Sequence, residues 1–469
     1  MTNHVRSLKR IGTLALAFSL TAGLGLLAGC GGSSGSSGGP GSTPARAFGE
    51  IESLGSIVVN GVTFEVEDGL VVGPDNQTPA PGMVVEVEGE INPDGVTGFA
   101  TAVTFDDNVK GPLTEVTGDA GVAVGQVMGQ TVIFEDNVTK FDPATGVPLG
   151  DDVDKVFQVS GFQDETGTIH ATFVREIADG GVLEVTGIVS NLGATTFEMN
   201  GLTVDYSGAT LRDLPPGGLD NGLLVEVKGT VFDPVEVRLT ATEIEGKVRG
   251  LGDDMPKVHV EGMIANLDTS AETFSLNGQT VSYSAAAFRA GDKTDLANGI
   301  KVEAEGPLSD GTLLATRVTF KASVRVEATV ASVGAATLTF LGLDGIEVLV
   351  HPDITRGFGA FEGLQVGTDV KVRARQGASD LVATRLEVEG EGTDRTIIRG
   401  PVTAVAGDIV TILGTVDVDT TSISNENFKD HDTSLGPNGR AVFFSRLREG
   451  DIVKARFRDG AWDEIEFQD

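Results

Sequence analysis

The chain has 469 residues, of which 34 are basic and 68 acidic, so its formal net charge at pH 7 is −34. A field of that sign repels phosphate backbones, and binding to nucleic acid depends on basic side chains, so the composition all but excludes a nucleic-acid-binding protein. Glycine is abundant, with 64 residues, and no segment beyond the amino-terminal region sustains a helical apolar period. These features predict an all-β protein.

The first 29 residues have the order of a bacterial secretory signal. Three basic and no acidic side chains lie among the first ten residues, and an apolar run follows from 11 to 27. Leu27-Ala28-Gly29-Cys30 then resembles the lipobox of bacterial lipoproteins, in which the cysteine is diacylated and becomes the first mature residue. The alternative is a plain transmembrane helix, for which seventeen residues is the short limit. We predict a signal peptide over 1–29 and lipidation of Cys30.

Residues 30–46 contain the lipidated cysteine and a Gly/Ser-rich linker. Such a linker is a flexible coil, which reaches roughly 20 Å over about fourteen residues. Two acyl chains hold a protein stably to a bilayer. Residue 31 is glycine and not the aspartate that resembles an inner-membrane retention signal, so we expect the outer membrane where the host has one. With Cys30 committed to lipid, no thiol remains for a disulfide.

From residue 47 onward the chain repeats one β-rich unit six times. The units open at Gly49, Gly111, Gly187, Gly262, Ala328 and Gly400. Repetition at this period predicts an array of small domains and not one large core. We place the repeats, numbered 1 to 6, at residues 47–109, 110–180, 181–252, 253–322, 323–392 and 393–469.

Each repeat begins with a strand that carries the opening glycine, followed by a hairpin. A glycine inside a strand predicts a bulge or a sharp bend. Asn-Gly is the strongest short hairpin signal, because both residues accept positive φ. It occurs in three repeats, and the other three offer Leu343-Asp344-Gly345 and the weaker pairs Met128-Gly129 and Leu413-Gly414. The Asn-Gly pairs are Asn60-Gly61, Asn200-Gly201 and Asn277-Gly278.

Two further strands follow a variable loop. In 82–89 valine alternates with glutamate, which predicts Val85 and Val87 in the core and Glu86 and Glu88 on a solvated face. The closing strand carries Ala-Thr in five repeats, and we expect this alanine where two sheet layers come close.

This order of features resembles a bacterial lipoprotein repeat family catalogued only as a domain of unknown function. The resemblance covers nearly all of 47–469 and is best in repeats 1, 3 and 4, whereas repeats 2 and 6 lack Asn-Gly. It implies a tandem array of about six small, OB-like, five-stranded β-barrels and supplies no catalytic residue. A barrel of about 65 residues buries only about 60% of its unfolded surface, so neighbours should support one another. The polar joins 245–256 and 389–395 are the predicted hinges.

The sequence predicts no catalytic site, no metal site and no cofactor. The histidines of the folded region lack zinc spacing, and the acidic loops lack the D-x-[DN]-x-[DN]-G pattern of calcium loops, so only weak calcium association is expected. Gly31 to Gly35 matches a G-x-S-x-G nucleophile motif, but the linker cannot supply the strand and helix that this motif needs. These histidines are His170, His259, His351 and His431.

The expected function is that of a non-enzymatic cell-envelope lipoprotein, a spacer or interaction scaffold. The membrane would be its partner through the lipid on Cys30, and an envelope protein or glycan is a candidate second partner. The alternative is an extracytoplasmic protein that binds a glycan, a peptide or a divalent cation at the variable loops, since OB-type barrels bind oligosaccharides through one face and its loops. The longest such loops are 68–81, 137–155, 207–221 and 421–435.

Overall fold

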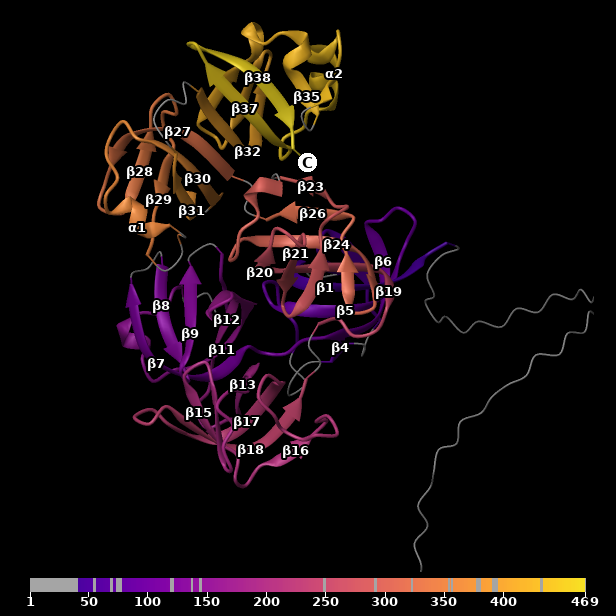
Figure 1. Ribbon diagram of the computed structural model, residues 1–469, viewed down its shortest axis with the longest axis vertical. Coiled ribbons are helices and arrows are strands. Elements are labelled where there is room, and N and C mark those ends of the chain that lie inside the picture. Colours follow the sequence, from indigo (N-terminus) through magenta and orange to yellow (C-terminus); the bar gives the residue numbers. More distant parts are fainter. Residues whose placement is uncertain are drawn as a thin grey trace, which may run out of the picture. The chain divides into compact units, whose positions relative to one another are not determined.

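The computed structural model describes residues 41–469 except for short internal segments, and it is built almost entirely of β-strands (Figure 1). The α-helices of the described chain are α1 (Phe358–Phe361) and α2 (Gly439–Arg446). The predicted signal peptide and Cys30 lie outside the described residues. So do residues 54–55, 68–70, 73–77, 119–121, 136–137, 143–145, 248–249, 291–292, 322–323, 353–354, 356, 377–380, 390–394, 431–432 and 469.

The first three repeats share one order of strands. Repeat 1 contains β1 (Thr43–Ser53), β2 (Ile57–Val59), β3 (Val62–Glu65), β4 (Val71–Val72), β5 (Val84–Ile91) and β6 (Thr97–Thr104). Repeat 2 contains β7 (Val109–Gly118), β8 (Val122–Val127), β9 (Gln130–Glu135), β10 (Lys140–Asp142), β11 (Val156–Gln163) and β12 (Ile169–Ile177). Repeat 3 contains β13 (Leu183–Ile188), β14 (Thr196–Met199), β15 (Leu202–Asp205), β16 (Thr210–Arg212), β17 (Leu224–Asp233) and β18 (Arg238–Gly246).

The last three repeats vary this order: repeats 4 and 6 have additional strands, whereas repeat 5 has five strands and the short helix α1. Repeat 4 contains β19 (Met255–Met263), β20 (Ala265–Asp268), β21 (Thr273–Leu276), β22 (Gln279–Ser282), β23 (Ala287–Arg289), β24 (Lys301–Ser309), β25 (Thr312–Leu314) and β26 (Arg317–Phe320). Repeat 5 contains β27 (Val324–Val333), β28 (Thr337–Phe340), β29 (Glu347–Leu349), β30 (Asp369–Gln376) and β31 (Leu381–Val388). Repeat 6 contains β32 (Arg395–Ala406), β33 (Ile409–Ile412), β34 (Val416–Asp419), β35 (Phe428–Asp430), β36 (Thr433–Ser434), β37 (Ile452–Arg458) and β38 (Ala461–Phe467).

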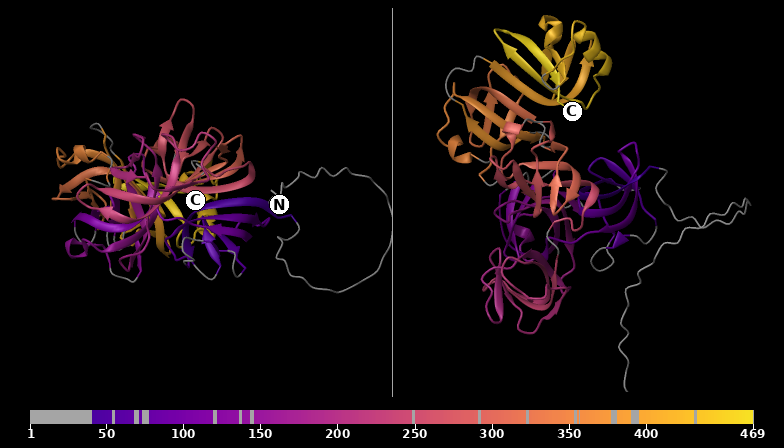
Figure 2. Two further views of the ribbon diagram at one scale, coloured as in Figure 1. Left: turned by 90° about the horizontal axis from the view of Figure 1, so that it is seen from below. Right: turned by 45° about the vertical axis from the view of Figure 1, so that its right-hand side comes forward.

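Strand pairing closes a ring within a repeat. In repeat 1 the opening strand β1 pairs with β2 and β5, β2 pairs with β3, and β6 completes the ring by pairing with β3 in parallel and with β5 in antiparallel orientation. The right-hand view of Figure 2 shows repeat 3, in magenta, curling in the same way. Alternate residues point into the core, as predicted for Val85 and Val87, which are buried. The all-β tandem array is therefore confirmed.

The opening strands join the repeats in pairs. β1 pairs in parallel with β19, so repeats 1 and 4 share a 14-stranded sheet. β7 pairs with β13 and β27 with β32, which gives two 12-stranded sheets from repeats 2 and 3 and from repeats 5 and 6. Mutual support between repeats is thus present, although one pair is not adjacent in sequence. Most of the predicted hinge at 389–395 lies outside the described residues, and the opening strands of the repeats on either side of it, β27 and β32, are hydrogen-bonded.

The opening glycine makes room for the hairpin. A Cβ atom at Gly111 would lie 2.5 Å from Cγ of Met128, and one at Gly262 would lie 2.6 Å from Nδ2 of Asn277. Asn277 Nδ2 donates a hydrogen bond to the Glu261 carbonyl at 2.6 Å, which fastens the hairpin to its own opening strand. Met128 has a φ of 47°, so the weaker pair Met128-Gly129 forms the same turn as the Asn-Gly pairs.

The Ala-Thr motif marks a β-bulge. In repeat 1 the register between β5 and β6 shifts at Gly89, which lies opposite Ala100. The next threonine, Thr101, donates its hydroxyl to the carbonyl of Glu88 at 3.2 Å. The same bond occurs in the other four repeats that carry Ala-Thr, at 3.0 to 3.3 Å. The alanine therefore lies opposite the paired strand at a bulge and is buried in the core. That two sheet layers come close at this position stays a prediction.

Candidate functional site

The charged face of the third strand is largely buried, so the prediction of a solvated face was wrong in most repeats. Glu226 and Glu303 are 2% and 7% exposed, and Arg373 is 2% exposed. Glu86 and Glu88 are partly covered and form ion pairs with Arg46. These side chains are buried because the opening strands of two repeats pair. The charged faces of both repeats then lie on one sheet, and other repeats cover that sheet.

The sheet of repeats 1 and 4 carries an ion-pair group centred on Lys301. Its ammonium nitrogen lies 2.9 Å from Glu261 and 3.2 Å from Glu50, and 4.6 Å from the ring centre of Phe162 in repeat 2. Burial opposes the charge of Lys301, but the two carboxylates outweigh it and raise the pKa of the lysine. Burial in turn raises the pKa of Glu50. Three repeats therefore meet at one cation.

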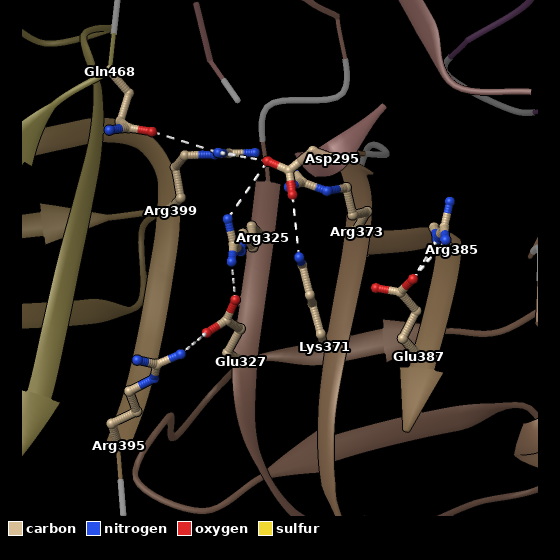
Figure 3. A network of polar contacts seen from close by, with 10 residues as sticks. All are labelled: Asp295, Arg325, Glu327, Lys371, Arg373, Arg385, Glu387, Arg395, Arg399 and Gln468. Carbon is tan, nitrogen blue, oxygen red and sulfur yellow. Dashed lines mark hydrogen bonds and ion pairs between the residues drawn. The ribbon is translucent and has the colours of Figure 1, made fainter. Parts of the chain in front are cut away.

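A second group, drawn in Figure 3, surrounds Asp295 of repeat 4. The Asp295 side chain has no exposed surface, and its carboxylate lies 3.2 Å from Lys371 Nζ and 3.5 Å from Arg325 Nη1. It also pairs with Arg373 and, at 3.7 Å, with Arg399, which lies on β32 of repeat 6. Buried charges are tolerated only when they are paired. One carboxylate of repeat 4 therefore compensates basic side chains of repeats 5 and 6.

The same group is extended by Glu327 on β27. Glu327 pairs with Arg325 of its own strand and, at 3.5 Å, with Arg395 at the start of β32. Burial, and then the neighbouring charge of Arg325, lower the pKa of Lys371. This arrangement can hold repeats 4, 5 and 6 together. Its acidic and basic side chains pair with one another.

A cavity of about 890 Å³ is bordered by residues of repeats 1 to 4. Asp107, in the short join between repeats 1 and 2, borders it and is 2% exposed. Gln158 Nε2 donates to Asp107 Oδ1 at 2.8 Å. Burial raises the pKa of Asp107 to about 7, although the bond from Gln158 opposes the shift. None of the variable loops predicted to bind a ligand lines this cavity in the described part of the chain.

The described histidines have separate neighbours. His259 Nδ1 lies 3.1 Å from Glu303, His170 Nε2 lies 3.5 Å from Asp164, and His431 lies outside the described residues. Among the residues that the structure describes, no group of three or more His, Cys, Asp or Glu side chains is placed to hold a metal ion. Nor does any helix within those residues have the length and apolar character needed to cross a membrane.

Sequence reasoning missed the two acidic residues that organise these sites, Asp107 and Asp295. Both lie in connecting segments, where acidic residues are common in this chain. A usable signal was present in the opening strands, because Lys110, Glu261 and Glu327 place charges at alternate positions like those of the third strand. Charges on two strands of one sheet indicate a shared polar interface, although they do not identify its partner.

Comparison with known proteins gives one family. Residues 48–104, 186–245 and 261–319 each match the family model described as a domain of unknown function, DUF5666. The three matches fall in repeats 1, 3 and 4, in which the resemblance to such a family is best. No curated protein matches the chain.

Proposed function

Since the chain is a tandem-repeat protein that contains three copies of the DUF5666 domain, we propose that it is a non-enzymatic envelope lipoprotein whose repeats form a spacer or interaction scaffold. The observation that carries this proposal is that contacts between repeats occupy the opening strands and the charged faces. Examples are the pairing of β1 with β19 and the ion pairs around Asp295. Such contacts build a scaffold from domains that would be marginal alone.

The anchoring part of the proposal is supported by the sequence of the amino-terminal region. A basic start, an apolar run and Leu-Ala-Gly-Cys at residues 27–30 give the order of a lipoprotein signal. A diacylated Cys30 would hold the array at a bilayer, with the outer membrane favoured where one exists. The strongly acidic chain would otherwise be repelled from anionic headgroups.

The test of anchoring is Cys30→Ser in the full chain, with Ser33→Ala in the adjacent linker as the matched control. We expect Cys30→Ser to abolish incorporation of labelled fatty acid and to move the protein from the membrane fraction to the soluble fraction. Ser33→Ala should do neither. Unchanged labelling of the Cys30→Ser protein would overturn the lipid anchor.

The test of the scaffold role is cross-linked co-purification of the lipidated protein from its own envelope. One stoichiometric protein or glycan partner would make the array an adaptor, whereas no partner after efficient cross-linking would favour a passive spacer. Turnover of ester, glycosidic or phosphate substrates by the purified chain would contradict the non-enzymatic role.

A further inference from the structure

We propose that the cavity bordered by repeats 1 to 4 is a binding site for a neutral oligosaccharide. This goes beyond the scaffold role and does not depend on the lipid anchor. The cavity volume of about 890 Å³ lies within the range of roughly 300–1,000 Å³ that is typical of small-molecule sites.

Four buried polar atoms of the cavity lining have no hydrogen-bond partner among the described residues, and one of them, Nε of Arg46, has an ion-pair partner in Glu86. The other three are Oδ2 of Asp107, Nε2 of Gln163 and Oγ1 of Thr186. A buried polar group without a partner costs about 1–3 kcal/mol, so three of them around one cavity indicate that a polar ligand binds there.

The backbone around Asn108 brings these three side chains into one region. The carbonyl of Asn108 accepts a hydrogen bond from the Thr186 amide at 3.0 Å, and Asn108 Oδ1 accepts one from the Gly161 amide at 2.7 Å. Asp107 precedes Asn108, and Gln163 lies two residues beyond Gly161 on β11. The site is therefore built by the join between repeats 1 and 2 together with β11 and β13.

The chemistry of the three atoms selects a neutral, hydroxyl-rich ligand. Oδ2 of Asp107 offers an acceptor when the carboxyl group is ionised and a donor when it is protonated, Gln163 offers a donor, and Thr186 offers a group that both donates and accepts. A cation would leave the Gln163 donor unmatched, and an anion would face the Asp107 carboxylate. A sugar hydroxyl donates and accepts, so it satisfies each of the three.

The basic side chains of the lining are already paired with carboxylates. Arg46 pairs with Glu86 at 3.0 Å, and Lys247 pairs with Asp106 at 3.4 Å and with Glu226, outside the lining, at 3.2 Å. The lining also contains the acidic Asp164 and Glu165, and apolar side chains such as Phe48 and Leu224 can cover the C–H faces of a sugar ring. The basic side chains of the lining are therefore not available to an anionic ligand.

The test is titration calorimetry of the mature full chain with three neutral trisaccharides: maltotriose, cellotriose and N,N′,N″-triacetylchitotriose. Sialyllactose and spermidine are the anionic and cationic probes. We expect at least one neutral sugar to bind, and we expect Thr186→Val and Gln163→Leu each to weaken that binding about three- to tenfold. Because the Thr186 hydroxyl has no hydrogen-bond partner in the described part of the chain, Thr186→Val should leave the unfolding midpoint unchanged.

The matched control is Thr172→Val, the same chemical change outside the cavity. Thr172 donates to the Ser160 carbonyl at 3.2 Å, so its loss should lower the unfolding midpoint and leave sugar affinity unchanged. Three results would overturn the proposal: no heat with any neutral sugar at about 10 mM, binding of spermidine or sialyllactose alone, or neutral-sugar binding that neither cavity substitution weakens.

Discussion

At the scale of single residues, Asp107 links protonation to folding. Its pKa in the folded chain is about 7, against an ordinary value of 3.8. Between about pH 4 and pH 7 the folded chain therefore holds a proton that the unfolded chain has lost, so this residue makes stability fall as pH rises through that interval and level off above it. Gln158, Glu184, Lys110 and Asp106 face the carboxyl group.

We expect Asp107→Asn to remove this contribution, because an amide does not titrate. The free energy of unfolding of the variant, relative to that of the parent, should rise with pH, by little at pH 4 and by up to about 4 kcal/mol at pH 8. Urea unfolding of both proteins from pH 4 to pH 8 measures the difference, in which titrations common to both cancel. A difference that stays constant with pH would contradict the raised pKa.

Asp295 shows the opposite role for a buried carboxylate, because basic groups surround it. Asp295→Asn leaves Arg373, Arg399 and Lys371 without their shared counter-charge, and removal of one partner from a buried ion pair costs about 3–5 kcal/mol. We expect a loss of that size in urea unfolding, with earlier proteolytic cleavage between repeats 4 and 5. Asp344→Asn, at an exposed aspartate of repeat 5, is the control and should be nearly neutral. Equal stabilities for the two variants would show that the Asp295 group is not structural.

At the scale of elements, the threonine of the Ala-Thr motif has a structural role at the β-bulge. The sequence pattern showed where the motif lies but not what the threonine does. Each hydroxyl donates to a carbonyl at the bulge, where the regular strand pairing is interrupted. We expect Thr172→Val, at a buried bulge, to lose about 1–2 kcal/mol of unfolding free energy, because the Ser160 carbonyl then lacks this donor. The exposed Thr242→Val should lose less, because water can replace the hydroxyl. Thermal unfolding of both variants checks the order, and a larger loss at Thr242 would refute the assignment.

Local patterns predicted the elements well because hairpins and alternating strands depend on neighbouring residues. Asn277-Gly278 predicted its turn through backbone preference, and Met128-Gly129 formed the same turn because the Met128 side chain packs against Gly111. The burial of the Glu226 side chain could not be predicted in this way. Alternation shows which residues share a face, whereas burial of that face depends on strand pairing between repeats. The cavity was missed for the same reason, since four repeats contribute to its lining.

At the scale of the whole array, the pairing of β1 with β19 couples repeats that are distant in sequence. The residues 45–48 pair with 257–260, so the opening strand of repeat 1 finds its strand partner in another repeat only after repeats 2 and 3 have been made. Lys301 strengthens this connection, because it pairs with Glu50 of repeat 1 and Glu261 of its own repeat. The stability of repeat 1 should therefore respond to a substitution in repeat 4.

We expect Lys301→Met to raise amide hydrogen exchange in β1 as well as in β19 and β24. Loss of the lysine leaves two carboxylates close together without their shared cation, so the effect should be largest at pH 8. It should shrink as the pH falls, because Glu50, whose pKa is already raised, takes up a proton. Lys228→Met in repeat 3 is the matched control, because Lys228 pairs with Glu226 within one repeat. Its effect should remain in β13 and β17. If Lys301→Met leaves exchange in β1 unchanged at pH 8, the two repeats are not energetically coupled through this contact, and the shared sheet alone must hold them.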